Sequence, residues 1–181
     1  MASLGERMIG AMKADVNTFE EIERDTTAMG QAVTVIVLAG VAALIGNVFR
    51  AGITTGIMFL LISLIGYAIW AFLVVIIGTK LMPEPSTKAD FNEGFRVVGF
   101  AASPGVFNVL AIIPFLGPLI SFVISLWSLV VMVVAVRTVL DYTNTGRAII
   151  VCLIGFVIYW IVSFMILTPI LIGRALTTGG L

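Results

Sequence analysis

The sequence predicts an all-α membrane protein, a bundle of five transmembrane helices with an interfacial amphipathic helix at its N-terminal end. Of the 181 residues, 60% are hydrophobic and only 11% are charged, and the mean hydropathy is +1.18. A chain this apolar carries more nonpolar side chains than a soluble core encloses. Its apolar residues form long continuous blocks, which indicate helices rather than the short alternating strands of a membrane barrel.

Four stretches of the chain contain no charged residue, and they cover residues 26–49, 51–79, 97–136 and 148–173. A helix of about 20 residues crosses a hydrocarbon core of about 30 Å. Three of the stretches therefore suit one crossing each. The third stretch would be about 60 Å long as a continuous helix at about 1.5 Å per residue, so it must turn and cross twice.

Basic residues predict the orientation of these five spans. Five crossings place the N-terminal segment, residues 80–96 and residues 137–147 on one side of the membrane. Basic residues are enriched in cytoplasmic loops, so we expect a cytoplasmic N-terminus and an external C-terminus. Eight basic residues lie on the predicted cytoplasmic side (Arg7, Lys13, Arg24, Lys80, Lys88, Arg96, Arg137 and Arg147), against Arg50 and Arg174 outside.

The first 30 residues predict a cytoplasmic segment before the first span. Leu4, Met8, Met12 and Val16 recur every four residues, which favours an amphipathic helix on the inner leaflet over a disordered polar tail.

An acidic turn follows this segment. Thr18 and Glu21 have the spacing of a capping box, which would begin a short helix there. The acidic face of that helix suits a protein contact better than anionic lipid, although a simple solvated face has the same pattern.

The third span contains a proline where a helix needs a hydrogen-bond donor. Pro104 removes a backbone N–H and would free the carbonyl of Phe100, and Asn108 follows one turn later on the same face. We expect a kink whose polar face looks into the bundle. That face is either a dry interface satisfied by Ser103 and neighbouring helices, or part of a binding cavity that includes Asn47 from the first span.

Two other sequence features concern the same half of the chain. The run "IPFLGP" at residues 113–118 predicts a tight external hairpin between the third and fourth spans. Ser121, Ser125 and Ser128 share one face of the fourth span, where they could bond to other helices, bond back to their own helix or line a pore.

The residue inventory excludes several kinds of site. The chain has no histidine and a single cysteine, Cys152, so no disulfide framework, histidine-ligated metal or haem is expected. No charged residue lies deep in a span, and Ser103 has no histidine to act as its base. We therefore predict no catalytic residue, no cofactor, no metal and no nucleic-acid partner.

A series of motifs in fixed order resembles the Yip family of Ypt/Rab-interacting integral membrane proteins. The series is "FNEGFRVVGFAASP", "IPFLGP", "SLWSLVVMVVAVR" and "NTGRA", with "FEEIERD" upstream. The resemblance implies five helices with the N-terminus in the cytosol. For eukaryotic relatives it implies binding of Rab-type small GTPases and a part in vesicle traffic or membrane shaping. The chain is similar to the compact prokaryotic branch, which implies an inner or plasma membrane.

The leading functional hypothesis is a non-enzymatic scaffold that organises partners or lipids at the cytoplasmic face. The expected partners are membrane lipids, a cytoplasmic protein (a small GTPase by resemblance) and a second copy of the chain. The alternative is a small-molecule or lipid transporter or channel with its site at the broken third helix, at Pro104, Asn108, Ser103 and Asn47. The candidate cytoplasmic residues are Glu20, Glu21, Asp90, Glu93, Arg96 and Arg147.

The predicted organisation has three parts. Residues 1–30 form the cytoplasmic segment, residues 31–173 form the five-helix domain, and residues 174–181 form a short external tail.

Overall fold

The described chain is helical throughout, with no strand among its residues. The structure, a computed structural model, describes the backbone of residues 2–178 and the side chains of these residues except 51, 59, 162–163 and 165–178. The elements in order are α1 (Leu4–Met12), α2 (Val16–Arg24), η1 (Thr26–Ala28), α3 (Met29–Ala51), α4 (Ile53–Ile76), η2 (Ile77–Leu81), α5 (Phe91–Phe100), η3 (Ser103–Ile112), α6 (Gly117–Val139) and α7 (Thr145–Thr178).

Four segments of the described chain are long and apolar enough to cross a membrane: Thr26–Arg50, Ile53–Leu81, Phe91–Ile112 and Gly117–Val139. A shorter apolar stretch, Thr145–Ile161, lies in α7, so the structure supports four to five spans. The predicted tail of residues 174–181 continues α7 as far as Thr178, and its last three residues lie outside the described chain.

The predicted hairpin between the third and fourth spans is confirmed. The 3-10 helix η3 ends at Ile112, and α6 begins at Gly117. Phe115 at the turn is fully exposed and has a φ of 65°, in the left-handed region that a tight reversal requires.

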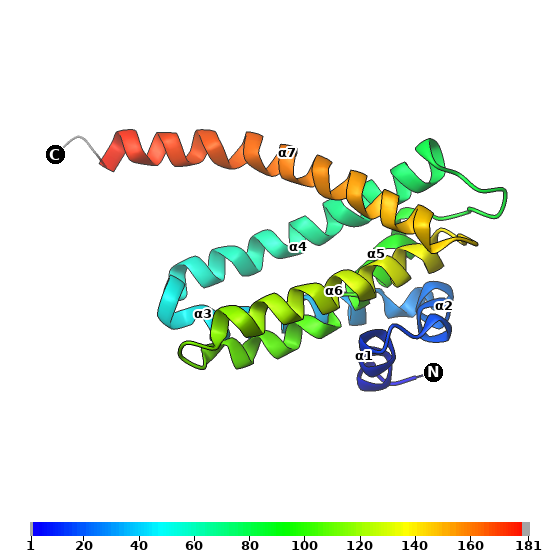
Figure 1. The fold of residues 1–181 in the computed structure, drawn as a ribbon, viewed down its shortest axis with the longest axis horizontal. Coiled ribbons are helices and arrows are strands. Elements are labelled where there is room, and N and C mark those ends of the chain that lie inside the picture. The colour runs from blue at the N-terminus through cyan, green and yellow to red at the C-terminus, as the bar shows by residue number, and fades with distance from the viewer. Residues whose placement is uncertain (1, 179–181) are drawn as a thin grey trace.

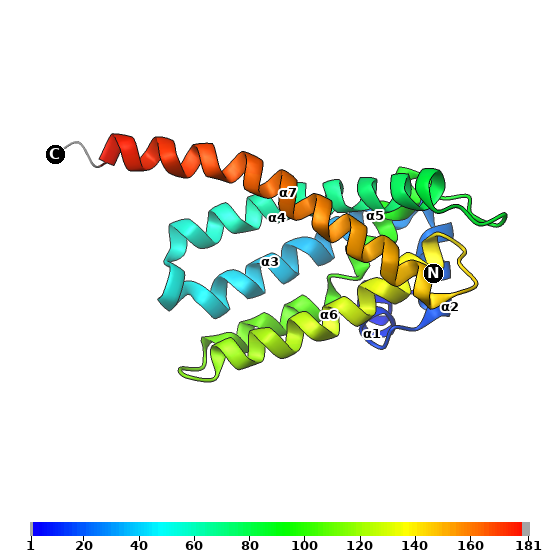
Figure 2. The same ribbon diagram turned by 45° about the horizontal axis from the view of Figure 1, so that its top comes forward.

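The connections gather at the two ends of the bundle. One end carries α1, α2, the loop between η2 and α5, and the turn between α6 and α7 (Figures 1 and 2). The opposite end carries the α3–α4 junction, the η3–α6 turn and the C-terminal end of α7 (Figure 1). This is the grouping of loops on which the predicted orientation depends, and we call the first end the N-terminal end.

The third span is two helices, not one kinked α-helix as the sequence predicted. The α-helix α5 ends at Phe100, and the chain continues as the 3-10 helix η3. Pro104 therefore lies in the first turn of η3, where its missing N–H is not needed. The Ser103 hydroxyl donates to the Phe100 carbonyl at 2.6 Å, so the break has a hydrogen-bond partner within its own segment.

Small residues allow η3 to lie unusually close to α3, and this is the most extensive contact between two elements. A Cβ on Gly105 would lie 2.9 Å from the Cβ of Ala39. A Cβ on Gly46 would overlap the carbonyl oxygen of Asn108. A backbone carbonyl cannot move aside as a flexible side chain can. Position 46 therefore accepts only glycine.

The same close approach continues from η3 into α5. A Cβ on Gly99 would lie 2.9 Å from the Cβ of Ala32. Residues 32, 39 and 46 are seven apart, which is two turns of an α-helix, so they form one line along α3. We call this contact the small-residue seam, and it comprises Ala32, Ala39 and Gly46 on α3 with Gly99, Gly105 and Asn108 on the third span.

The N-terminal segment is helical, but it does not form the single amphipathic helix with a lipid-facing surface that the sequence predicted. The chain turns at Ala14, with a φ of 54°, so residues 4–24 form two short helices. Leu4 and Met8 pack against the protein core, whereas Ile9 and Val16 are exposed. The part of the predicted lipid-facing surface that holds Leu4 and Met8 therefore faces the protein.

The caps of these helices also differ from the prediction. Asp15, not Thr18, is the N-cap of α2, because the helix begins one turn earlier, and the Thr18 hydroxyl donates to Asp15 at 2.7 Å. A full capping box pairs Ser3 with Glu6 at the start of α1. Asp90 is the N-cap of α5.

We expect Gly46→Ala to destabilise the bundle by about 1–3 kcal/mol, because the added methyl group has no space beside the Asn108 carbonyl. Gly30→Ala is the matched control on the same helix. A Cβ at position 30 meets no atom within 4 Å, and alanine is the better helix former, so this change should leave stability equal or slightly higher. Thermal unfolding in detergent measures both, and a neutral Gly46→Ala would contradict the seam.

Candidate interaction face at the N-terminal end

A buried arginine joins the first three helices at the N-terminal end. Arg7 of α1 is only 1% exposed, and its guanidinium forms ion pairs with Glu21 and Asp25 of the α2 region. Its other terminal nitrogen donates to the Gln31 side chain of α3 at 2.9 Å. Burial opposes the charge on Arg7, but the hydrogen bonds to Asp25 and Glu21 outweigh it and raise the Arg7 pKa. Arg7 therefore fixes α1 against α2 and α3.

A second buried arginine binds the backbone at the C-terminal end of α2. Arg96 of α5 is 4% exposed, and its guanidinium donates to the carbonyls of Ile22 and Glu23. The last carbonyls of a helix have no partner within the helix and carry partial negative charge, so a cation there satisfies and stabilises them. Arg96 was predicted as an exposed interaction residue, but its burial makes it a residue that positions α2.

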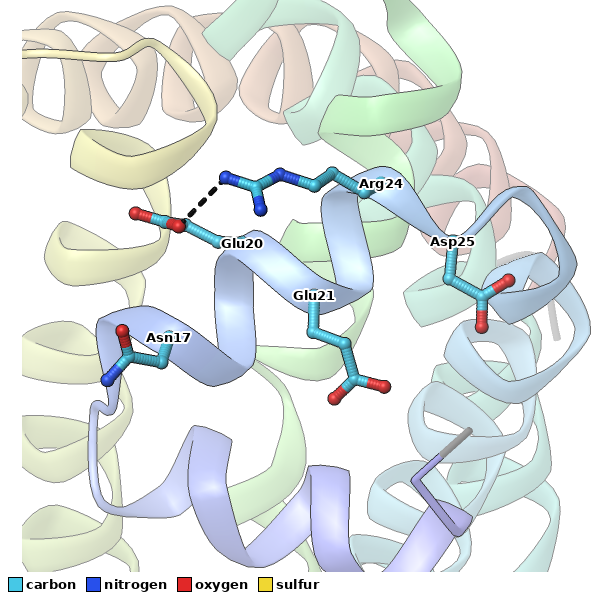
Figure 3. A pocket seen from close by; sticks show the side chains of 5 residues that line it. All are labelled: Asn17, Glu20, Glu21, Arg24 and Asp25. Atoms are coloured by element: carbon cyan, nitrogen blue, oxygen red, sulfur yellow. Dashed lines mark hydrogen bonds and ion pairs between the residues drawn. The ribbon is translucent and has the colours of Figure 1, made fainter.

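The outward face of α2 is polar and open. Figure 3 shows Asn17, Glu20, Glu21, Arg24 and Asp25 around an open hollow of about 520 Å³. Arg24 forms an ion pair with Glu20 one turn away at 3.0 Å, while Glu21 and Asp25 project from another side of the helix (Figure 3). The face has three carboxylates and one guanidinium, and the Arg7 guanidinium pairs with two of the carboxylates, so the net charge with Arg7 included is −1. We call these five residues the α2 face.

The carboxyl groups near this face differ in their affinity for protons. Hydrogen bonds from Thr27 and Arg7 lower the pKa of Asp25 to about 2, so it is ionised at neutral pH. Burial raises the pKa of Glu23 to about 7, and the nearby Asp141 and Glu93 contribute to the shift. Among the described residues, no three His, Cys, Asp or Glu side chains are placed to hold a metal ion.

The loops beside α2 are tied together by polar contacts. Arg147 of α7 forms an ion pair with Glu84 at 3.2 Å, and Glu84 also accepts from the backbone N–H and the hydroxyl of Thr143, each at 3.1 Å. The Tyr142 hydroxyl donates to the Met82 carbonyl at 2.7 Å. The loop before α5 and the α6–α7 turn therefore form one connected surface.

The predicted cytoplasmic residues have several structural roles. Asp90 and Glu93 form the capping box of α5, with hydrogen bonds of 2.9 and 3.0 Å between each side chain and the other residue's N–H. Arg147 is engaged with Glu84, so it is not free for a partner. The structure brings together only Glu20 and Glu21 on one exposed surface, the α2 face.

The predicted intramembrane residues satisfy most of their hydrogen bonds locally. Ser103 and Pro104 are buried at the start of η3. The Asn108 amide donates to the Gly105 carbonyl at 3.0 Å, and the Asn47 amide donates to the Ala43 carbonyl at 2.9 Å. Asn47 and Asn108 line two different hollows, so the structure does not combine them in one site.

Sequence reasoning missed the two residues that hold this end together, Arg7 and Glu84. The helical pattern does predict a buried Arg7, because Arg7 lies on the same face of the helix as Leu4, Met8 and Ala11. A charged side chain within an apolar face must have a buried partner. Glu84 lies in an irregular loop between two prolines, and no local pattern indicates its partner.

One known protein family matches most of the chain. The Yip1 domain model matches residues 9–165, which include α2, both halves of the third span and the first part of α7. The chain belongs to the Yip1 domain family. The predicted Yip-family resemblance is thereby confirmed, and the α2 face lies inside the Yip1 domain. No curated protein and no solved structure matches the chain.

We expect Arg7→Gln to release α1 from α2 and α3, since it leaves Glu21 and Asp25 without their cation. The cost of breaking such a partly buried pair is up to about 3–5 kcal/mol. Hydrogen–deuterium exchange should become faster across residues 4–24 and remain unchanged in α6. Arg24→Gln is the control, because Arg24 is 77% exposed in its ion pair and such pairs contribute little. Equal exchange in both variants would contradict the role of Arg7.

The raised pKa of Glu23 predicts a pH dependence. In the folded chain Glu23 keeps its proton up to about pH 7, whereas in the unfolded chain it loses the proton near its ordinary value of 4.5. Stability should therefore fall as pH rises between these values. The opposite contribution of Asp25 is lost only as pH falls towards about 2, outside that range.

A thermal unfolding series tests this dependence. Between about pH 5.5 and about pH 8, Glu23→Gln should reduce the loss of melting temperature seen in the wild type. Glu20→Gln, which removes an outward carboxylate of the same helix, should retain the wild-type loss. A Glu23→Gln curve parallel to the wild type would show that Glu23 does not titrate in this range.

Proposed function

We propose that this Yip-family membrane protein is a non-enzymatic scaffold whose α2 face binds a cytoplasmic protein. The observation that carries the proposal is the way α2 is held. Arg7 and Arg96 fix α2 from the side that faces the bundle, while Glu20 and Arg24 remain outside. A surface that is already ordered loses less conformational entropy on binding.

The distribution of charge supports a cytoplasmic location for this face. Eight of the ten basic residues lie in the segments that meet at the N-terminal end, which are residues 1–25, 80–96 and 137–147. The opposite end holds Arg50 at the end of α3 and Arg174 in α7. By the positive-inside rule the N-terminal end lies in the cytoplasm, and the C-terminus lies outside.

The chemistry of the α2 face indicates a partner with a basic surface. The net negative charge of the face repels anionic headgroups, which are concentrated at cytoplasmic membrane surfaces. A protein that carries lysine or arginine residues is the better match. The family resemblance adds small GTPases as one partner class and membrane traffic or shaping as the process.

Transport through the third span finds no support in the family match. In the described residues, the freed carbonyl of Phe100 and the amides of Asn47 and Asn108 have partners in their own helices.

Photocrosslinking in living cells tests the scaffold. A photoreactive amino acid at Asn17, an exposed residue of the α2 face, should give a discrete protein adduct. Adding Glu20→Lys, or Glu20→Arg in a second variant, reverses the charge of a carboxylate that takes no part in the Arg7 ion pairs, and either change should abolish the adduct. Adding Lys88→Glu, a reversal on an exposed loop of the same end, should leave the adduct unchanged.

The same photoreactive amino acid at position 115 provides the control for orientation, because Phe115 is fully exposed at the opposite end. The Asn17 adduct should not form there. A cytosolic protein trapped at Phe115 but not at Asn17 would contradict the orientation. An adduct at Asn17 that survives both charge reversals would contradict recognition by the α2 face.

A further inference from the structure

Three hollows adjoin inside the bundle, and Ser63 of α4 lines all three. Their volumes are about 220, 410 and 350 Å³. The 350 Å³ hollow lies among α3, α4, η3 and α6, and we call it the serine hollow. The 220 Å³ hollow lies among α4, α6 and α7, and we call it the aromatic hollow.

The serine stripe of the fourth span faces the serine hollow. The sequence left open whether these serines bond to other helices, bond back to their own or line a cavity. All three line this hollow, together with a tyrosine and a serine of α4 and an asparagine of η3. The polar lining residues are Ser63, Tyr67, Asn108, Ser121, Ser125 and Ser128.

Some of these polar groups lack a partner. The hydroxyls of Ser63 and Ser125 each donate to a carbonyl of their own helix at 2.7 Å. The hydroxyls of Tyr67, Ser121 and Ser128 have no hydrogen-bond partner among the described residues. At membrane depth a polar group without a partner is unfavourable, because lipid chains accept no hydrogen bonds.

The aromatic hollow contains a further unpartnered donor. The indole nitrogen of Trp70 is buried and has no acceptor in the described chain. The Trp70 ring packs edge to face on Tyr159 of α7, with centroids 6.3 Å apart. Tyr67 and Ser63 line both the aromatic hollow and the serine hollow. The unpartnered donors of the two hollows therefore lie next to one another.

The chemistry of the lining selects an uncharged ligand. No Asp, Glu, Lys or Arg lines any of the three hollows. A charged group there would be buried without a counter-ion, which is strongly unfavourable. Hydroxyl groups and an amide can instead bond to a ligand that carries hydroxyl or ester oxygens.

The surroundings favour a ligand with an apolar chain. Beside the aromatic hollow, α4 and α7 carry exposed apolar side chains, among them Ile65, Phe72 and Phe156. These outward side chains face the region that lipid chains occupy. A polar hollow of this size beside an apolar surface suits an amphiphile better than a fully water-soluble molecule.

We propose that the serine hollow binds the uncharged, hydroxyl-bearing head of a membrane amphiphile such as a diacylglycerol, with its apolar chain running past the aromatic hollow between α4 and α7. The head bonds to the unpartnered hydroxyls of Tyr67, Ser121 and Ser128. This site is separate from the α2 face, and it requires no transport across the membrane.

Photolabelling of the full chain in phosphatidylcholine nanodiscs tests the site. A photoreactive diacylglycerol should label α4 and α7 more strongly than a phosphatidic acid with the same chains and photoreactive group. Ser121→Leu with Ser128→Leu fills the serine hollow and should reduce the diacylglycerol labelling about eightfold, the effect of losing two hydrogen bonds in a membrane. Val123→Leu with Val130→Leu adds bulk on the exposed side of the same helix and should leave labelling unchanged.

A second pair of variants covers the case in which the leucine variant does not fold. Ser121→Ala with Ser128→Ala removes both hydroxyls without adding bulk, and it should abolish the preference for diacylglycerol over phosphatidic acid. Equal labelling by both lipids in the wild type, or a preference that survives the alanine pair, would overturn the proposal. Loss of labelling on addition of excess glycerol would also overturn it, because the ligand would then be a soluble polyol.

Discussion

The close approach of α3 to the third span is the constraint on which the rest of the structure depends. Gly46 meets the backbone of Asn108 with no room for a side chain, and Ala39 and Ala32 face glycines of the opposite segment. Association of helices in lipid depends on packing and on hydrogen bonds, because the hydrophobic effect does not drive it there. The break before Pro104 serves this contact, since it allows η3 to follow α3 as a 3-10 helix while Ser103 satisfies the freed carbonyl.

This contact also determines where the N-terminal helices lie. Gly99 against Ala32 fixes α5, and α5 carries Arg96 to the last carbonyls of α2. Arg7 then joins α1 to the side chains of Glu21 and Asp25, and Phe19 and Ile22 of α2 are fully buried in the core. The position of the α2 face therefore depends on successive contacts that start at the small-residue seam. A substitution in the seam should therefore alter the α2 face.

The parts of this architecture that depend on local properties could be predicted from the sequence. Hydropathy is a property of each segment, so the apolar helices were found, and the proline and glycine residues at 113–118 indicated the hairpin. The 3-10 geometry of η3 could not be predicted, because the local sequence does not show that this segment packs against Gly46 from a distant part of the chain. The role of Arg96 was missed for the same reason, since charged residues near a span end are usually exposed. The α2 face was found only in part, because Glu20 and Glu21 stood out as acidic but the cations that hold the helix lie elsewhere.

Coupling between the seam and the α2 face is the central claim, and hydrogen–deuterium exchange of one seam variant measures it most directly. Ala32→Leu places a large side chain against Gly99 of α5. The control is Val33→Leu, which enlarges an exposed side chain at the next position. The account predicts faster exchange across Val16–Arg24 in the Ala32 variant and unchanged exchange there in the control. Unchanged exchange of α2 in an Ala32 variant whose α3 and η3 have lost protection would contradict it.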